Sequence, residues 1–130
     1  MLFRSAAGVD LVLKTGTAKI LTHEMNLSKI FLDSLSQIPG LTVWGPPNTN
    51  NRVATIAVSL QGYSSSDLSA ALEREAQILT RPGLHCAPLA HRHLGSFQSG
   101  GSTRFSIGLY NTEKEILITL ETLARLSNRK

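Results

Sequence analysis

The sequence lacks several features that would point to particular classes of protein. It contains one cysteine, so no internal disulfide can form, and this usage suits a reducing cytoplasm. Its apolar runs are only a few residues long, whereas a membrane-spanning helix needs about 20. Asp10 interrupts the partly apolar start of the chain, and no small-residue cleavage site follows it. We therefore expect a soluble cytoplasmic protein with no signal peptide and no membrane partner.

Aromatic residues are also scarce, at 5% of the chain. The net charge of +4 suits an acidic partner such as nucleic acid, but the arginines are scattered and only the segment 125–130 concentrates positive charge. No basic segment is interleaved with aromatic side chains that would stack on bases. We therefore expect a solvated basic surface and no nucleic-acid partner. No internal repeat or low-complexity linker is present.

The apolar pattern that is present predicts a small domain of helices and strands. With 42% hydrophobic residues, a chain of 130 residues can bury one core. Apolar residues spaced by four predict a helix from Thr17 to Gln37, which Pro39 and Gly40 end. Strands are predicted over Leu41–Trp44 and Val53–Leu60, with a loop rich in proline, glycine and asparagine between them.

In the second half of the chain the apolar pattern predicts two further helices, with a loop and a strand between them. Ser66 is the expected N-cap of a helix. Its apolar face is expected to contain Leu68, Leu72, Ala76 and Leu79. The segment 80–101 has no sustained period and indicates a functional loop with a short helix near Leu89–Leu94.

The end of the chain has the clearest local signals. Alternation over Thr103–Leu109 predicts a half-buried strand, with Phe105 on one face and Arg104 on the other. Thr112 and Glu115 have the spacing of a capping box, which predicts a helix immediately after them. Since each helix has one apolar stripe, we predict an α/β fold of the two-layer, α+β sandwich type.

Cys86 is the first candidate for chemistry. It lies in a loop of glycine and proline, with His85 adjacent and Arg81 nearby, and this setting favours the thiolate that acts as a nucleophile. The simpler alternative is that a lone cysteine is a small buried hydrophobic side chain. Arg104 is the second candidate, because a guanidinium pairs with a carboxylate through two hydrogen bonds. Its simpler alternative is an ordinary arginine facing solvent.

The histidines near Cys86 do not predict a metal site. His85, Cys86, His91 and His93 fall within nine positions, but the adjacent His85 and Cys86 do not converge easily on one ion. No CxxC or HExxH frame accompanies them. His23 lies in the first predicted helix and is expected to be a surface or hydrogen-bonded side chain.

Three segments share a pattern with a known family: Gly83–His91 with Gly95, Thr103–Ser106, and Tyr110–Ile116. Together they resemble the end of class V aminotransferase-type proteins, specifically the cysteine desulfurase and selenocysteine lyase group. The resemblance extends upstream through 37–40, 44–46 and Arg52, and so covers nearly the whole chain from about Gly16 onward.

The resemblance implies the small carboxy-terminal domain of a fold type I enzyme that uses pyridoxal phosphate. Residues 1–15 would then be a lead-in from the missing large domain, and residues 16–130 the small domain. By resemblance, Cys86 attacks the substrate sulfur to form a persulfide, and Arg104 binds the α-carboxylate. Arg81 and His85 are expected to line the substrate site. The implied partners are the large domain, a second subunit in a homodimer, and a protein that accepts the sulfur.

The sequence also departs from that family pattern at several positions. The family's cofactor lysine, preceded by histidine, has no counterpart here, so we expect no pyridoxal phosphate on this chain alone and no catalysis by it. Pro82 stands where a small residue is usual, and Gly100-Gly101 precedes the strand of Arg104. Two alternatives stay open, namely an aminotransferase or other β-lyase of the same fold, and a stand-alone binding domain whose freed face a partner covers.

Overall fold

An antiparallel sheet forms one layer of the structure, a computed structural model that describes residues 2–129. In the described residues its strands are β1 (Leu41–Trp44), β2 (Thr55–Leu60), β3 (Arg81–Gly83) and β4 (Ser102–Ser106). They lie in the order β1-β2-β4-β3, and each neighbouring pair is antiparallel. Strand β4 therefore lies inside the sheet, although it comes last in the chain.

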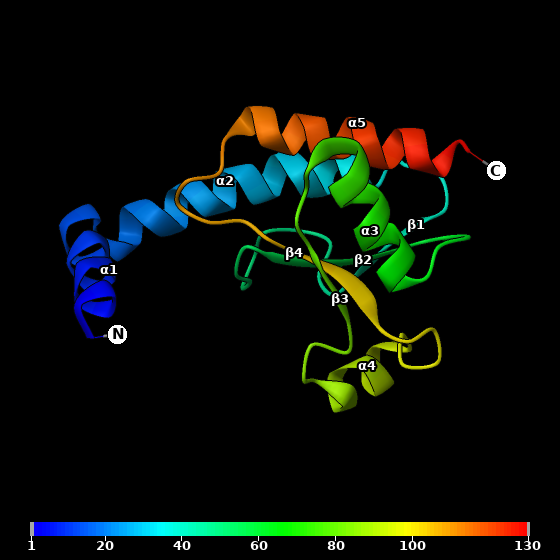
Figure 1. Cartoon of the computed structure of the whole chain (residues 1–130), viewed down its shortest axis with the longest axis horizontal. Helices are drawn as coiled ribbons and strands as arrows, with labels where there is room; N and C mark the ends of the chain where they lie inside the picture. Colours follow the sequence, from blue (N-terminus) through cyan, green and yellow to red (C-terminus); the bar gives the residue numbers. More distant parts are fainter. Residues whose placement is uncertain (1, 130) are drawn as a thin grey trace.

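Helices form the second layer on one face of this sheet. They are α2 (Thr17–Leu35), α3 (Ser65–Ala76) and α5 (Glu113–Ser127), with α2 and α5 running side by side (Figure 1). The short helix α4 (Pro88–Leu94) lies on the other side, next to β3 and β4 (Figure 1). The α/β fold of the two-layer, α+β type is therefore confirmed.

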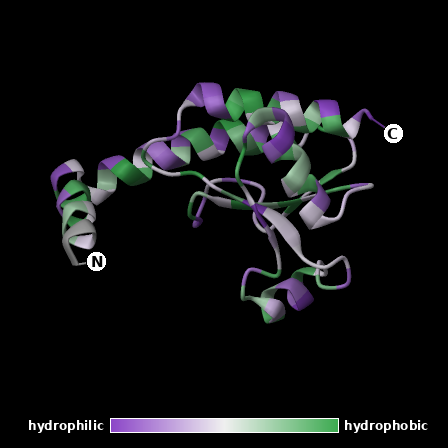
Figure 2. Cartoon of the chain, in the orientation of Figure 1, coloured by the Kyte–Doolittle hydropathy of each residue, from purple (hydrophilic) through white to green (hydrophobic). Residues whose placement is uncertain are grey.

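Strand alternation places the core between the two layers. In β2 the side chains of Ile56 and Val58 are fully buried, whereas Ala57 between them is partly exposed. Phe31 of α2 meets Phe105 of β4 edge to face, with ring centroids 5.1 Å apart. Figure 2 shows the hydrophobic and hydrophilic stretches that alternate along α2 and α5, as expected for helices that cover a sheet with one face.

Helix α1 (Leu2–Thr15) precedes this domain and points away from it (Figure 1). Gly16 separates α1 from α2 and has a φ of 85°, a left-handed value that glycine adopts at low cost. The last turns of α1 expose large apolar side chains, including Leu13 at 74%. The boundary predicted between residues 15 and 16 coincides with this change of direction, but the division into domains stays a prediction. Within residues 2–129, no helix is long and apolar enough to cross a membrane.

Two features predicted for α3 are wrong. Its N-cap is Ser64 and not Ser66, because the Ser64 hydroxyl accepts the amide hydrogen of Asp67. Leu79 does not belong to its buried face, because Gln77 takes a left-handed conformation (φ 56°) that ends the helix, and Leu79 is 80% exposed. The buried stripe consists of Leu68, Ala71 and Leu72.

The capping box of α5 is confirmed. Thr112 accepts the amide hydrogen of Glu115, and the Glu115 carboxylate accepts that of Thr112. These bonds hold the pKa of Glu115 below its ordinary value. Asn111 adds to the turn, since its side-chain oxygen accepts the Gly108 amide hydrogen at 2.9 Å. Strand β4 ends at Ser106, three residues before the predicted end, because this turn begins there.

The predicted loop 80–101 contains more regular structure than its sequence indicates. The short helix near Leu89–Leu94 is confirmed as α4, which Pro88 begins. Strand β3 was not predicted, because three residues that include Pro82 and Gly83 have no strand period. Its place at the edge of the sheet explains how a proline is tolerated there.

Candidate functional site

Strand pairing brings Arg81 and Arg104 together on the face of the sheet that α2, α3 and α5 leave open. The two residues are directly opposite one another across β3 and β4. Their side chains therefore project from the same face, since opposite residues in an antiparallel pair do so. Like charges at opposed positions destabilise a sheet. A bound anion would relieve that cost.

Arg104 has a free donor in a sheltered position. Its Nε atom is buried from solvent and has no hydrogen-bond partner among the described residues. A buried N–H without an acceptor costs on the order of 1–3 kcal/mol, more for a charged group, so natural structures usually satisfy such groups. The Arg104 Nε is therefore a donor that no described residue satisfies, a feature that it shares with the Nε of Arg52.

Ser102 repeats this feature two residues earlier on β4. It is fully buried, and its hydroxyl oxygen also has no partner in the described part of the chain. Because side chains alternate along a strand, Ser102 and Arg104 project from the same face. Sequence analysis did not select Ser102, since serine at this position carries no signal of its own.

The cysteine lies in a tight turn immediately after β3. His85 and Cys86 both have positive φ values, 54° and 58°, which are uncommon for residues other than glycine and cluster at functional sites. The Ala87 amide donates to the Leu84 carbonyl at 2.8 Å and closes the turn. The Cys86 side chain is exposed, so the alternative of a buried hydrophobic cysteine is wrong. Arg81 Nη2 lies 3.8 Å from Cys86 Sγ.

His85 holds this turn against strand β3. Its Nε2 atom lies 2.8 Å from the Arg81 carbonyl oxygen, which makes Nε2 the protonated nitrogen of a neutral ring. Partial burial lowers the pKa of His85 below its ordinary value, and the charges of Arg104, His91 and Arg81 lower it further. The hydrogen bond to the Arg81 backbone opposes these effects. The neutral imidazole is therefore favoured beside Cys86.

Gly101 fixes how closely the start of β4 approaches the cysteine turn. A Cβ atom at this position would lie 2.2 Å from the Gly83 carbonyl oxygen, and the Gly101 φ is 97°. Only glycine fits both the contact and the backbone conformation. The Gly100-Gly101 segment noted in the sequence is thus part of the support of the site.

Two of the histidines considered as metal ligands have other partners: His85 lies against the Arg81 carbonyl, and His91 Nδ1 lies 2.7 Å from the Ser96 hydroxyl. His23, on α2, has its Nε2 atom 2.9 Å from the Asn111 carbonyl oxygen. His23 is therefore a hydrogen-bonded side chain, as expected. Across residues 2–129, no group of three histidine, cysteine or acidic side chains is placed to hold a metal ion.

The residues of the open face fit a cofactor-bearing active site only in part. Arginine, histidine and hydroxyl donors are present to bind an anion, but the described lysines lie elsewhere. Lys14 lies on α1, Lys19 and Lys29 on α2 and Lys114 on α5; Lys130 is outside the described residues. Since α2 and α5 cover the opposite face of the sheet, Lys19, Lys29 and Lys114 lie away from Arg104. A pyridoxal group at this face would need its lysine from another part of a protein.

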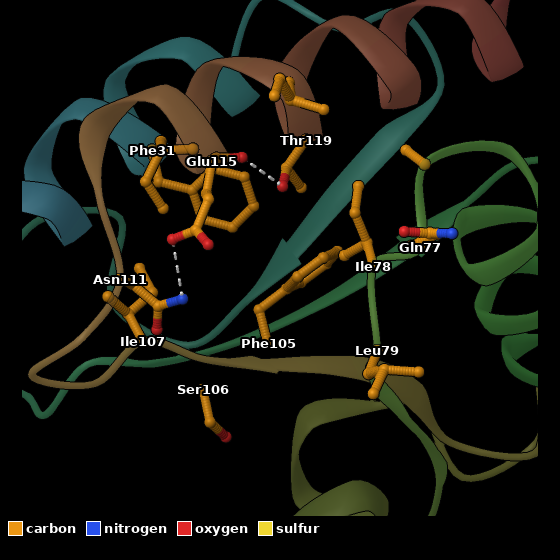
Figure 3. A pocket seen from close by; sticks show the side chains of 13 residues that line it. Phe31, Gln77, Ile78, Leu79, Phe105, Ser106, Ile107, Asn111, Glu115 and Thr119 are labelled. Carbon is orange, nitrogen blue, oxygen red and sulfur yellow. Dashed lines mark hydrogen bonds between the residues drawn. The ribbon is translucent and has the colours of Figure 1, made fainter.

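A hollow of about 460 Å³ lies on the helical side of the sheet. Figure 3 shows Phe31, Phe105 and Ile78 along its apolar wall, with Asn111 and Glu115 at its polar end. None of the four residues predicted for the site lines it. We therefore assign the candidate site to the open face and not to this hollow.

Comparison with known proteins shows the family of the chain. The family model described as "Aminotransferase class-V" matches residues 2–118. The chain belongs to the class V aminotransferase family. A probable cysteine desulfurase from Methanothermobacter thermautotrophicus is 31% identical over 121 residues, which is 93% of this chain and 30% of the relative. A probable cysteine desulfurase from Synechocystis is 33% identical over 118 residues, covering 90% and 27%.

Comparison with solved structures shows that the chain also shares the fold of this family. The apo structure of a cysteine desulfurase from Thermococcus onnurineus superposes with a TM-score of 0.86 at 26% identity. The match covers 94% of this class V chain and 29% of that structure. The chain thus spans about 30% of the length of the relatives that it matches.

Proposed function

We propose that this chain is the small carboxy-terminal domain of a cysteine desulfurase-like enzyme, and that its open sheet face is one wall of the active site. The observation that carries the proposal is the convergence of Arg104, Arg81 and the Cys86 turn on that face. The similarity to desulfurases over nearly the whole chain supports it.

In this proposal Arg104 binds the α-carboxylate of cysteine or selenocysteine. A guanidinium can donate two parallel hydrogen bonds to one carboxylate. Strand β4 is internal in the sheet, so strands on both sides hold the backbone from which Arg104 projects. Arg81 adds positive charge from the neighbouring strand.

Cys86 is proposed as the nucleophile. Its thiolate attacks the substrate sulfur or selenium; an S–S or S–Se bond forms, and the bond from that atom to the substrate carbon breaks. The bonding electron pair leaves with the carbon. The transferred atom remains on Cys86 as a persulfide or selenopersulfide, exposed at the surface, where the thiol of an acceptor protein can reach it.

Pyridoxal phosphate, when bound by the rest of the enzyme, supplies the electron sink for this chemistry. Because no described lysine lies on the Arg104 face, we propose that the large domain contributes the lysine. The family resemblance further implies that the intact enzyme is a homodimer. The chain alone then binds and orients but does not turn over substrate.

The first experiment adds pyridoxal phosphate and cysteine to the chain alone. We expect no absorbance band of a covalently bound cofactor and no released sulfide. Sulfide release by this chain at a rate typical of an enzyme would contradict the proposal that its active site is incomplete.

The second experiment restores the missing part. Residues 2–129 replace the matching segment of the Methanothermobacter relative in one continuous polypeptide. We expect this hybrid to release sulfide from cysteine, and Cys86→Ser to abolish the release. If Cys86→Ser leaves cofactor-dependent turnover intact, an aminotransferase or other β-lyase is the better interpretation, since those reactions need no thiol.

A stand-alone binding domain is the second candidate function. Several large apolar side chains are exposed, including Leu13, Leu79 and Leu89 at 74%, 80% and 75%. Under this alternative a separate polypeptide covers them, and the chain recovers a partner from its own host in a pull-down. A monomer that recovers no partner would count against it.

A further inference from the structure

Helix α4 has three basic side chains in its last turn, and one of them is buried. His91 is 5% exposed, whereas Arg92 and His93 are exposed. A buried histidine loses hydration, and partners for its ring nitrogens must offset that loss. His91 Nδ1 has such a partner 2.7 Å away in the hydroxyl of Ser96, which is fully buried itself.

The pair His91 and Ser96 connects the two segments that flank α4. The His91 amide donates to the Ala87 carbonyl at 3.2 Å, directly after the cysteine turn. On the other side, the Gly101 amide donates to the Ser96 carbonyl at 2.9 Å, directly before β4. The pair therefore joins the turn that carries Cys86 to the strand that carries Arg104.

The His91 ring also packs against the ring of His85, with centroids 5.3 Å apart. His85 and Cys86 are the two adjacent residues with positive φ, a conformation that persists only where the surroundings hold it. Two contacts hold His85: its hydrogen bond to the Arg81 carbonyl and this packing against His91. The charged or titratable groups that face it are Arg81, Arg104 and His91.

We infer that His91, fixed by Ser96, is a positioning residue for Cys86. It keeps the His85 ring against the Arg81 carbonyl, and so keeps Cys86 in the left-handed conformation that exposes Sγ beside Arg81. This inference rests on the proposed function only in taking Cys86 as the nucleophile. It deepens that function by adding a residue that acts without touching substrate.

The test is the rate at which iodoacetamide alkylates the full chain. Cys86 is the only cysteine, so the rate reports on this thiol alone. We expect His91→Leu, which removes both ring nitrogens, to slow alkylation at least about threefold as the strained turn relaxes. His91→Asn, which can place an amide near the position of Nδ1, is expected to stay within about twofold of the parent. The matched control is His93→Leu on the same helix, which is expected to leave the rate unchanged.

A second readout separates positioning from general loss of stability. The titration of His85 is followed by NMR, and its midpoint is expected to rise towards the ordinary value in His91→Leu but not in His93→Leu. If His91→Leu does not fold, as judged by far-ultraviolet circular dichroism, Ser96→Ala decides, and the same slower alkylation is expected.

Two results would overturn the inference. The first is alkylation at the parent rate in folded His91→Leu, or in Ser96→Ala if His91→Leu does not fold. The second is an equal reduction of the alkylation rate in the control His93→Leu. Alkylation needs neither cofactor nor substrate. Its outcome is therefore independent of whether the hybrid enzyme releases sulfide, and the two proposals can fail separately.

Discussion

The two faces of the sheet use the same strands for different purposes. On the helical face Ile56, Val58 and Phe105 are buried against α2, α3 and α5. On the open face Ala57 and Arg104 lie opposite one another between β2 and β4, and the arginine Nε has no partner within residues 2–129. Alternation along each strand thus separates residues that stabilise the fold from residues available for binding. Substitutions on the two faces should therefore change the free energy of unfolding by different amounts and with different signs.

The largest effect is expected on the helical face. Phe31→Ala removes a ring that is 1% exposed and packs on Phe105, and should lower the free energy of unfolding by about 3–5 kcal/mol. Urea denaturation measures this change. Leu89→Ala, at a residue 75% exposed on α4, is the control and should change stability by less than about 0.5 kcal/mol. A similar loss of unfolding free energy in both variants would contradict the distinction between a buried helical face and an exposed one.

The next effect concerns the junction between the cysteine turn and β4. Gly101→Ala should cost about 2–4 kcal/mol of unfolding free energy, because its Cβ meets the Gly83 carbonyl and its backbone is left-handed. Gly100→Ala shares the positive φ but has open space around its Cβ, so about 1–2 kcal/mol is expected. Urea denaturation measures both changes. If Gly101→Ala and Gly100→Ala lose the same unfolding free energy, the close approach of Gly101 to the Gly83 carbonyl does not affect stability.

Substitution on the open face is expected to have a small effect of opposite sign. Arg104→Met keeps the apolar stem but removes a buried free donor and the like charge opposite Arg81. Stability should be unchanged or raised by up to about 1 kcal/mol. In the hybrid enzyme the same change should abolish sulfide release. Arg52→Met is the control, since Arg52 also has a buried Nε without a partner in the described chain but donates from its other nitrogens to the Pro46 and Thr55 carbonyls, and the loss of those bonds should cost about 1–3 kcal/mol.

The smallest effect is a pH dependence that originates at His85. Because the folded chain lowers the pKa of His85, the unfolded chain takes up this proton first as the pH falls. The contribution of His85 to stability is therefore complete above about pH 6.5 and is lost as the pH falls through the folded pKa. His85→Gln should reduce the difference in unfolding free energy between about pH 7.5 and 5.5. His93→Gln should leave that difference unchanged, and an equal reduction in both variants would contradict this origin.

Much of the fold could be predicted from sequence where one local signal dominates. The spacing of four residues between Leu27, Phe31 and Leu35 predicts α2, and Thr112 with Glu115 predicts the start of α5. The alternation around Phe105 correctly placed Arg104 on the opposite face. Each of these signals arises from residues close together in the chain.

The remaining features depend on contacts between distant segments. Strand β3 exists because it pairs with β4, and its own sequence contains a proline and a glycine. The opposition of Arg81 and Arg104, and the fit of Gly101 against Gly83, follow from that pairing. The buried free hydroxyl of Ser102 and the pair His91–Ser96 leave no periodic signal. The family resemblance implies roles for Cys86 and Arg104, but it does not imply which contacts hold them.

We propose above that the open face of the sheet forms one wall of a desulfurase active site. Mass spectrometry of the hybrid enzyme after one turnover with cysteine tests it most directly. We expect the peptide containing Cys86 to gain the mass of one sulfur atom, and Arg104→Met to prevent this gain. Sulfide release by the hybrid with Cys86 unmodified, or at the same rate in Cys86→Ser, would contradict it.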